Sequence, residues 1–200
     1  LEMTHHPLPE GIEFLSIYSG IPRSLATSEY NERQASCTKA VEVLSKADPA
    51  VKALRDATPE LVEQCKEEMG DMVYRRAKHV VTEQKRVFDI IKAFADNDHK
   101  AIGASLLAGH KSLAEDYEVS LPVMDEMVDW LMQNEGVIGA RITGAGFGGS
   151  MICLVDADKV DVDSLSHRFV EEFTPKTPEA PELWKLTSVD GARYQPTLEI

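Results

Sequence analysis

The hydrophobic pattern is clearest between Asp71 and Asp96, where apolar side chains recur every three or four residues. This spacing predicts one long helix with a buried stripe and a charged outer face. The stripe runs through Val73, Ala77, Val80, Gln84, Val87, Ile91 and Phe94. Asn97 and Asp98 then predict a turn, and the leucine-rich segment after them predicts a second helix that packs back against the first.

Elsewhere the pattern predicts strands near the two ends of the chain and helices between them. The expected strands are Ile12–Ile17, Gly136–Ile142, Met151–Val155 and Leu186–Val189. The other expected helices are Ser28–Asp48, with Thr27 or Ser28 as the cap, Ala50–Asp56, Pro59–Glu68, one beginning at Pro122 and Asp161–Phe173, and the proline-rich residues 174–181 are expected to form a loop. This order favours an α+β architecture over alternating βαβ units, in one domain over residues 1–200.

Composition narrows the class of partner. The 200 residues carry 21 Lys and Arg against 34 Asp and Glu, a net charge of −13, which argues against nucleic acid or an anionic membrane as the main partner. A hydrophobic fraction of 43% is typical of a globular protein, and no apolar run approaches the roughly 20 residues of a membrane span.

The three cysteines point to a reducing compartment. Cys37, Cys65 and Cys153 are odd in number and widely spaced, so we expect neither a disulfide framework nor a metal site. No basic segment followed by an apolar stretch opens the sequence, which predicts a cytoplasmic protein. Because the first residue is Leu1 and not Met, we interpret the chain as a piece of a longer protein.

The densest chemical signal is the segment from Thr143 to Ser150, which holds four glycines in six positions. Glycines at this density suit a backbone at positive φ or a backbone whose amides approach an anion closely. No Lys-Ser/Thr pair follows, as a Walker loop requires, and the next segment is a predicted strand, unlike a dinucleotide fingerprint. A phosphate contact and a tight, bulged hairpin connection both remain open on spacing alone.

Residues 139–149 resemble the C-terminal glycine motif of the GHMP family of sugar and small-molecule kinases, and in particular the galactokinases. Residues 23–33, 76–83 and 110–120 are similar to further stretches of the same family, in the same order. The resemblance therefore covers essentially the whole chain. It implies the C-terminal domain of such a kinase, with a ferredoxin-like antiparallel sheet and a layer of helices that includes a long helix hairpin.

The resemblance also implies an activity, the ATP-dependent phosphorylation of the C1 hydroxyl of galactose. Tyr30 matches the family tyrosine that contacts the sugar. Six residues match the loop beside the sugar and the transferred phosphoryl group: Gly144, Ala145, Gly146, Phe147, Gly148 and Gly149. The family's catalytic residues and its sites for ATP and Mg²⁺ belong mainly to an N-terminal half whose motifs do not occur here. The resemblance thus implies that this chain alone is inactive and that the N-terminal half is its partner.

Alternative interpretations accompany each of these assignments. Without the resemblance, Tyr30 reads as a packing tyrosine with a solvated hydroxyl. The family also admits a kinase for another sugar, such as N-acetylgalactosamine or a uronic acid, and a non-catalytic sugar sensor. His110 is expected to be a core histidine with satisfied hydrogen bonds, Glu83 and Arg86 a surface ion pair, and Arg141 a solvent-facing residue.

Overall fold

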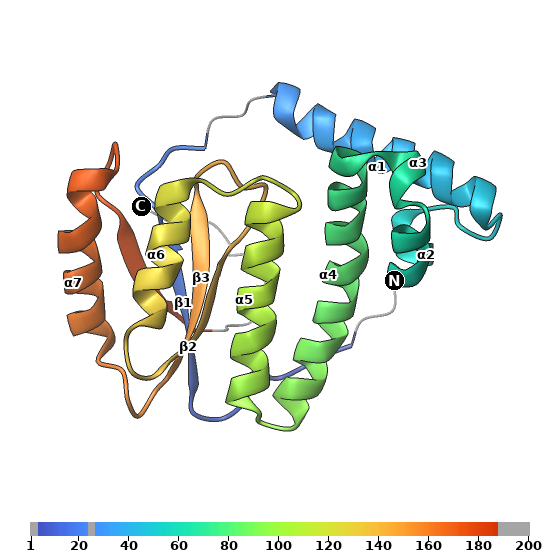
Figure 1. The fold of residues 1–200 in the computed structure, drawn as a ribbon. Helices are drawn as coiled ribbons and strands as arrows, with labels where there is room; N and C mark the ends of the chain where they lie inside the picture. Colours follow the sequence, from blue (N-terminus) through green and yellow to red (C-terminus); the bar gives the residue numbers. More distant parts are fainter. Residues whose placement is uncertain (1–3, 24–26, 188–200) are drawn as a thin grey trace, which may run out of the picture.

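The structure is a computed structural model that describes residues 4–23 and 27–187, without the side chains of residues 27 and 28. The described elements are β1 (Ile12–Tyr18), α1 (Thr27–Ala47), the 3₁₀ turn η1 (Leu54–Asp56), α2 (Pro59–Gln64), α3 (Lys66–Met69), α4 (Asp71–Ala95), α5 (His99–Glu115), α6 (Pro122–Met132), β2 (Val137–Ile142), β3 (Ser150–Asp156), α7 (Val162–Phe173), the 3₁₀ turn η2 (Thr174–Lys176) and β4 (Glu182–Leu186). The helices α4 and α5 form the expected hairpin, and α1 crosses the upper part of α4 (Figure 1).

The four strands form one antiparallel sheet in the order β2-β3-β1-β4. With helices between β1 and β2 and between β3 and β4, this is the ferredoxin-like topology. Tyr18, the last residue of β1, pairs with Ser150, the first residue of β3. The register therefore places the exit of β1 and the connection between β2 and β3 at one end of the sheet, the end at which α1 begins (Figure 1).

One face of the sheet carries the main core, because alternate residues of each strand point toward α6 and α7. Leu15 and Ile17 of β1 pack there with aromatic residues of α7, of which Phe169 and Phe173 are fully buried. The rings of Phe169 and Phe173 lie 4.9 Å apart, and Trp130 of α6 meets both edge-on. These contacts fix α6 and α7 on that face.

The opposite face is covered unevenly. Helix α5 and the end of α4 cover its β2 side, where Ile102, Leu106 and Ala93 pack against Ile12 and Leu154. The helix approaches the strand closely because residue 103 is glycine: a Cβ there would lie 2.0 Å from the carbonyl oxygen of Ile138. Toward the other edge, Trp184 and Leu186 of β4 stay exposed beside Phe14 and Ile152 of β1 and β3. We call the surface formed by Phe14, Ile152, Trp184 and Leu186 the open face.

The sequence predictions of fold class and element order are confirmed, with differences in detail. The last strand begins at Glu182, and residues 188 and 189 of its predicted span lie outside the described residues. The expected loop at 174–181 opens with η2. The prediction of one buried stripe along α4 is wrong at Gln84 and Val87, because Gln84 is exposed and Val87 is 52% exposed, whereas Ile91 and Phe94 farther along the stripe are partly buried.

The change of burial along α4 has a structural reason. Its first half packs against α1 and α2 through Val73, Ala77 and Val81. Its last turns instead pack toward the sheet through Ile90, Ala93 and Phe94, of which Ile90 and Ala93 lie off the predicted stripe. Val87, which lies between these two sets of contacts, is therefore left largely exposed.

Candidate functional site

The glycine loop (residues 143–150) connects β2 to β3 and closes on itself through the Thr143 amide, which donates to the Ser150 carbonyl at 3.0 Å. All four of its glycines have positive φ, between +77° and +107°. Close packing adds a second requirement at Gly146, where a Cβ would lie 2.3 Å from the Val119 carbonyl oxygen. Phe147 also adopts a positive φ, +57°, which is uncommon for a non-glycine residue.

The backbone amides of the loop divide into two sets. The Phe147 amide donates to the Val119 carbonyl at 2.8 Å, and the Gly149 amide donates to the Ile21 carbonyl at 2.9 Å, so these two hold the loop in place. Thr143, Gly144 and Ala145 are exposed. Among the described residues, the amides of Gly144 and Ala145 donate to no protein group, so they are the part of the loop that is available to an anion.

Tyr30 lies in the first turns of α1 with its side chain 66% exposed. One turn later, Arg33 is buried, and its guanidinium carbon lies 5.0 Å from the centre of the Phe147 ring. The structure thus brings the helix turn that carries Tyr30 to the side of the glycine loop. The Tyr30 hydroxyl makes no hydrogen bond to the described residues, so the phenol is open to solvent or a ligand.

Two arginines beside the loop were not singled out by the sequence analysis. The Arg23 guanidinium covers Gly144 and Gly149 closely, so that a Cβ at Gly144 would lie 2.5 Å from its Nη2 atom. Arg33 contacts the loop as described above. A sequence signal for Arg33 did exist, because it shares one stripe of α1 with Cys37, Ala40 and Leu44, and a charged residue on an apolar stripe is unusual.

A hydrogen-bonded cluster joins α4 to the end of α5 behind this site. His79 Nδ1 lies 3.0 Å from Ser112 Oγ, and Ser112 Oγ donates to Asp116 at 2.9 Å. The His79 ring stacks on Tyr117 with centroids 4.6 Å apart. Burial lowers the pKa of His79 to about 4 and raises the pKa of Tyr117 to about 12, so both side chains are neutral near pH 7. The cluster is buried and joins two helices, which is a structural role.

Two sequence predictions about α5 and β2 need correction. His110 is buried as expected but not satisfied: its Nε2 lies 3.2 Å from Asp125 Oδ1 without hydrogen-bond alignment, and neither ring nitrogen has a hydrogen-bond partner among the described residues. Arg141 does not face solvent, because its Nη1 donates to Glu83 at 2.6 Å. Glu83 also accepts from Arg86 at 2.7 Å, so the expected surface pair is a half-buried, three-residue cluster.

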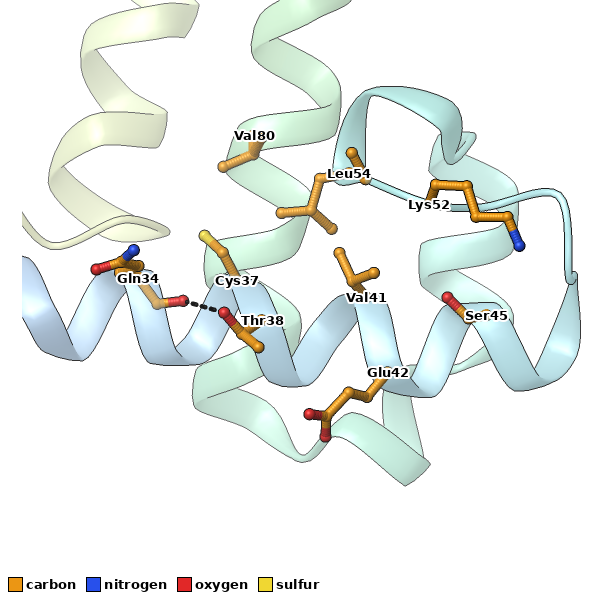
Figure 2. A pocket seen from close by; sticks show the side chains of 10 residues that line it. Gln34, Cys37, Thr38, Val41, Glu42, Ser45, Lys52, Leu54 and Val80 are labelled. Carbon is orange, nitrogen blue, oxygen red and sulfur yellow. Dashed lines mark hydrogen bonds between the residues drawn. The ribbon is translucent and has the colours of Figure 1, made fainter.

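A separate hollow of about 650 Å³ lies between α1, η1 and α4. Figure 2 shows Cys37, Val41 and Leu54 converging on its apolar floor, while Glu42 and Lys52 point away. Burial raises the pKa of the Cys37 thiol, which disfavours the reactive thiolate. None of the residues predicted for the site lines this hollow, and its apolar floor is part of the packing between helices.

Two further features of the described chain bear on its class. None of its helices is both long and apolar enough to cross a membrane. Within residues 4–23 and 27–187, no three His, Cys, Asp or Glu side chains are grouped as a metal site would need.

Comparison with known proteins agrees with the class suggested by this fold and loop. Residues 90–174 match the family model described as GHMP kinases C terminal. The matched segment is thus a C-terminal domain of the GHMP kinase type, and it covers α5, α6, β2, the glycine loop, β3 and α7.

Within that family the chain is similar to galactokinases. It is 34% identical to a galactokinase of Glaesserella parasuis over 96% of the chain and 50% of that protein, and 36% identical to one of Streptomyces coelicolor over 92% of the chain and 46% of that protein. The fold matches the crystal structure of Lactococcus lactis galactokinase complexed with galactose, with a TM-score of 0.82 and 29% identity over 92% of this chain and 47% of that one. The chain thus spans about half the length of the relatives it matches.

Proposed function

We propose that this chain is the C-terminal part of an ATP-dependent galactokinase that transfers a phosphoryl group to the C1 hydroxyl of galactose. In this proposal Tyr30 binds the sugar, and the glycine loop lies beside the sugar and the transferred group. The observation that carries the proposal is the contact of Arg33 with Phe147, which joins the α1 turn bearing Tyr30 to the loop. Two segments more than 100 residues apart in sequence thereby border one place on the surface.

The requirements of phosphoryl transfer support our proposal that the active-site groups are shared between this chain and an N-terminal half. Transfer requires a nucleophilic hydroxyl in line with the γ-phosphate and positive groups that neutralise the developing charge. The free amides of Gly144 and Ala145 and the Arg23 guanidinium are the groups beside this site that suit an anion. We place the catalytic carboxylate and most of the ATP and Mg²⁺ sites in the N-terminal half, so the chain alone should be inactive.

The exposed apolar side chains of this chain suggest where another part of the same protein would pack. Trp184 and Leu186 are 45% and 48% exposed on the sheet, and Val87 and Phe88 of α4 are 52% and 63% exposed. Exposed apolar groups gathered on one sheet face and one helix are typical of an interaction surface. We propose that the other half of the protein packs there. A kinase that uses ATP and a free sugar also suits the cytoplasm, where we place the whole protein.

The test is a turnover assay on the full-length protein that carries this chain. ATP consumption is measured with galactose, glucose and mannose, and the product is analysed for phosphate on C1. We expect galactose to be consumed faster than the other two sugars. The 200-residue chain alone, assayed in parallel, is expected to show no turnover.

Other outcomes would point to other members of the same class. Turnover of N-acetylgalactosamine or a uronic acid with little turnover of galactose would replace the substrate and keep the reaction. Binding of galactose and ATP without turnover would favour a sensor. Equal turnover of all sugars, or neither binding nor turnover, would refute the proposal.

A further inference from the structure

Arg33 is a buried cation whose main ligands are not carboxylates. Its side chain is nearly inaccessible, and Nη2 donates to the Glu118 carbonyl at 2.6 Å while Nε donates to the Tyr117 carbonyl at 3.3 Å. The nearest carboxylate, that of Glu32, lies 3.6 Å away and is mostly exposed. A buried charge is unfavourable unless its geometry is well satisfied, so a residue of this kind at a helix surface needs an explanation beyond packing.

Arg33 contacts two non-glycine residues whose backbone lies in the unfavourable left-handed region. Glu118 has a φ of +56° and Phe147 a φ of +57°. Arg33 binds the carbonyl of the first and stacks on the ring of the second. Non-glycine residues stay in this region only when their surroundings determine the conformation, and such positions gather at functional sites.

The turn that Arg33 binds is also the support of the glycine loop. Val119 follows Glu118 directly, and its carbonyl accepts the Phe147 amide at 2.8 Å. The Glu118 carboxylate is held on its other side by Arg75 at 3.1 Å. One guanidinium therefore contacts the α5 turn and the loop at once, from a position one helical turn after Tyr30.

We propose that Arg33 is a positioning residue that holds the glycine loop in register with the first turn of α1, and thus with Tyr30. This inference rests on the function proposed above. Arg33 touches neither sugar nor phosphate in this role. It acts through the Phe147 ring and the carbonyls of Tyr117 and Glu118, and it sets where the free amides of Gly144 and Ala145 lie relative to the Tyr30 phenol.

The experiment compares Arg33→Lys and Arg33→Met in the full-length protein that carries this chain. Lysine keeps the charge but has no planar fork to bridge two carbonyls and stack on a ring, whereas methionine keeps only the length. Kinetic constants for galactose and ATP are measured together with the melting temperature. We expect kcat to fall about 10-fold to 100-fold for Arg33→Met, with a smaller fall for Arg33→Lys, since misplacement of a group by about 1 Å has effects of this size.

A matched control separates positioning from stability. Arg76 is at least as buried and donates to Ser36 at 2.8 Å; its Nη2 lies 3.5 Å from the Glu118 carboxylate, which Arg75 also holds, but it contacts neither Phe147 nor the carbonyls that Arg33 binds. Arg76→Met is expected to lower the melting temperature at least as much as Arg33→Met and to leave kcat within about two-fold of wild type, measured well below both melting temperatures. Equal losses of kcat in both variants would overturn the proposal.

A coupling measurement gives the proposal a second test. Phe147→Leu removes the ring from the other side of the contact, so Phe147→Leu combined with Arg33→Met should lose no more activity than Arg33→Met alone. Additive losses would contradict a shared role.

Amide hydrogen exchange reports on the loop without any turnover. Arg33→Met should speed exchange in a peptide spanning residues 143–150, and Arg76→Met should not. Unchanged exchange in the Arg33 variants would overturn the positioning role even in an active kinase. Faster exchange in a protein that phosphorylates no sugar would instead refute only the proposed function.

Discussion

The sharpest stability prediction compares two glycines that share a backbone conformation and differ in their surroundings. Gly146 has a φ of +80° and Gly11 a φ of +78°, so alanine suffers a similar backbone penalty at either site. A Cβ at Gly11 would meet nothing within 4 Å. At Gly146 it would lie 2.3 Å from the Val119 carbonyl oxygen and 2.7 Å from Val119 Cβ. The difference between the two variants therefore isolates the packing of the loop.

The magnitude follows from three contributions. An alanine in the left-handed region costs about 1–2 kcal/mol, which is the whole effect expected for Gly11→Ala. For Gly146→Ala, Val119 or the loop must move by about 1 Å, and overpacking of this kind costs about 1–3 kcal/mol. That movement also breaks the 2.8 Å hydrogen bond from the Phe147 amide to Val119, which adds about 1 kcal/mol. Gly146→Ala should thus be less stable than Gly11→Ala by about 2–4 kcal/mol.

The assay is urea unfolding of the 200-residue chain followed by circular dichroism, with thermal melts alongside. For a protein of this size the difference corresponds to roughly 5–15 °C in Tm. Gly70→Ala serves as a second open control, because Gly70 has a φ of +74° and nothing within 4 Å of its virtual Cβ. If Gly146→Ala were no less stable than the two controls, the close packing of the loop on Val119 would be refuted.

Three further predictions concern single side chains. Tyr30→Phe should raise the KM for galactose in the full-length protein by about 5-fold, the loss of one hydrogen bond of about 1 kcal/mol, and an unchanged KM in steady-state kinetics would remove Tyr30 from the sugar site. Because burial lowers the pKa of His79 to about 4, the unfolded chain binds a proton that the folded chain does not between pH 6.5 and pH 4. Stability should fall by up to about 3 kcal/mol across that window as the pH decreases, and His79→Gln should flatten the urea midpoint measured against pH. Glu83→Gln leaves Arg86 and Arg141 without their shared carboxylate and should cost about 1–3 kcal/mol in urea unfolding, reduced by partial exposure, whereas a change below about 0.5 kcal/mol would match the surface pair that the sequence suggested.

The sequence predicted an element well where its buried residues recur at the spacing of a helix or a strand. Helix α7 is an example, since Leu165, Phe169 and Phe173 recur at helical spacing and all three are buried on the sheet. The glycine loop was also located correctly, because its glycines all have positive φ, a conformation that favours glycine.

The partners of buried polar groups could not be predicted, because they are set by tertiary contacts. Arg33 donates to carbonyls 84 and 85 residues away, and any residue type supplies a carbonyl. Arg141 alternates with apolar neighbours and therefore reads as solvent-facing, yet α4 places Glu83 within 2.6 Å of it. The pattern for His110 predicted burial correctly and could say nothing of its hydrogen bonds.

The error along α4 has a different origin and carries information. The apolar spacing predicts that Val87 is buried, whereas Val87 and the adjacent Phe88 are 52% and 63% exposed. Exposed apolar side chains that lie next to each other are typical of an interaction surface, so Val87 and Phe88 suit the contact with another part of the protein that we propose above. The relatives are about twice as long as this chain, and in our proposal the additional half supplies that contact. Val87 thus contradicts the prediction for this chain and agrees with it for the longer protein that we propose.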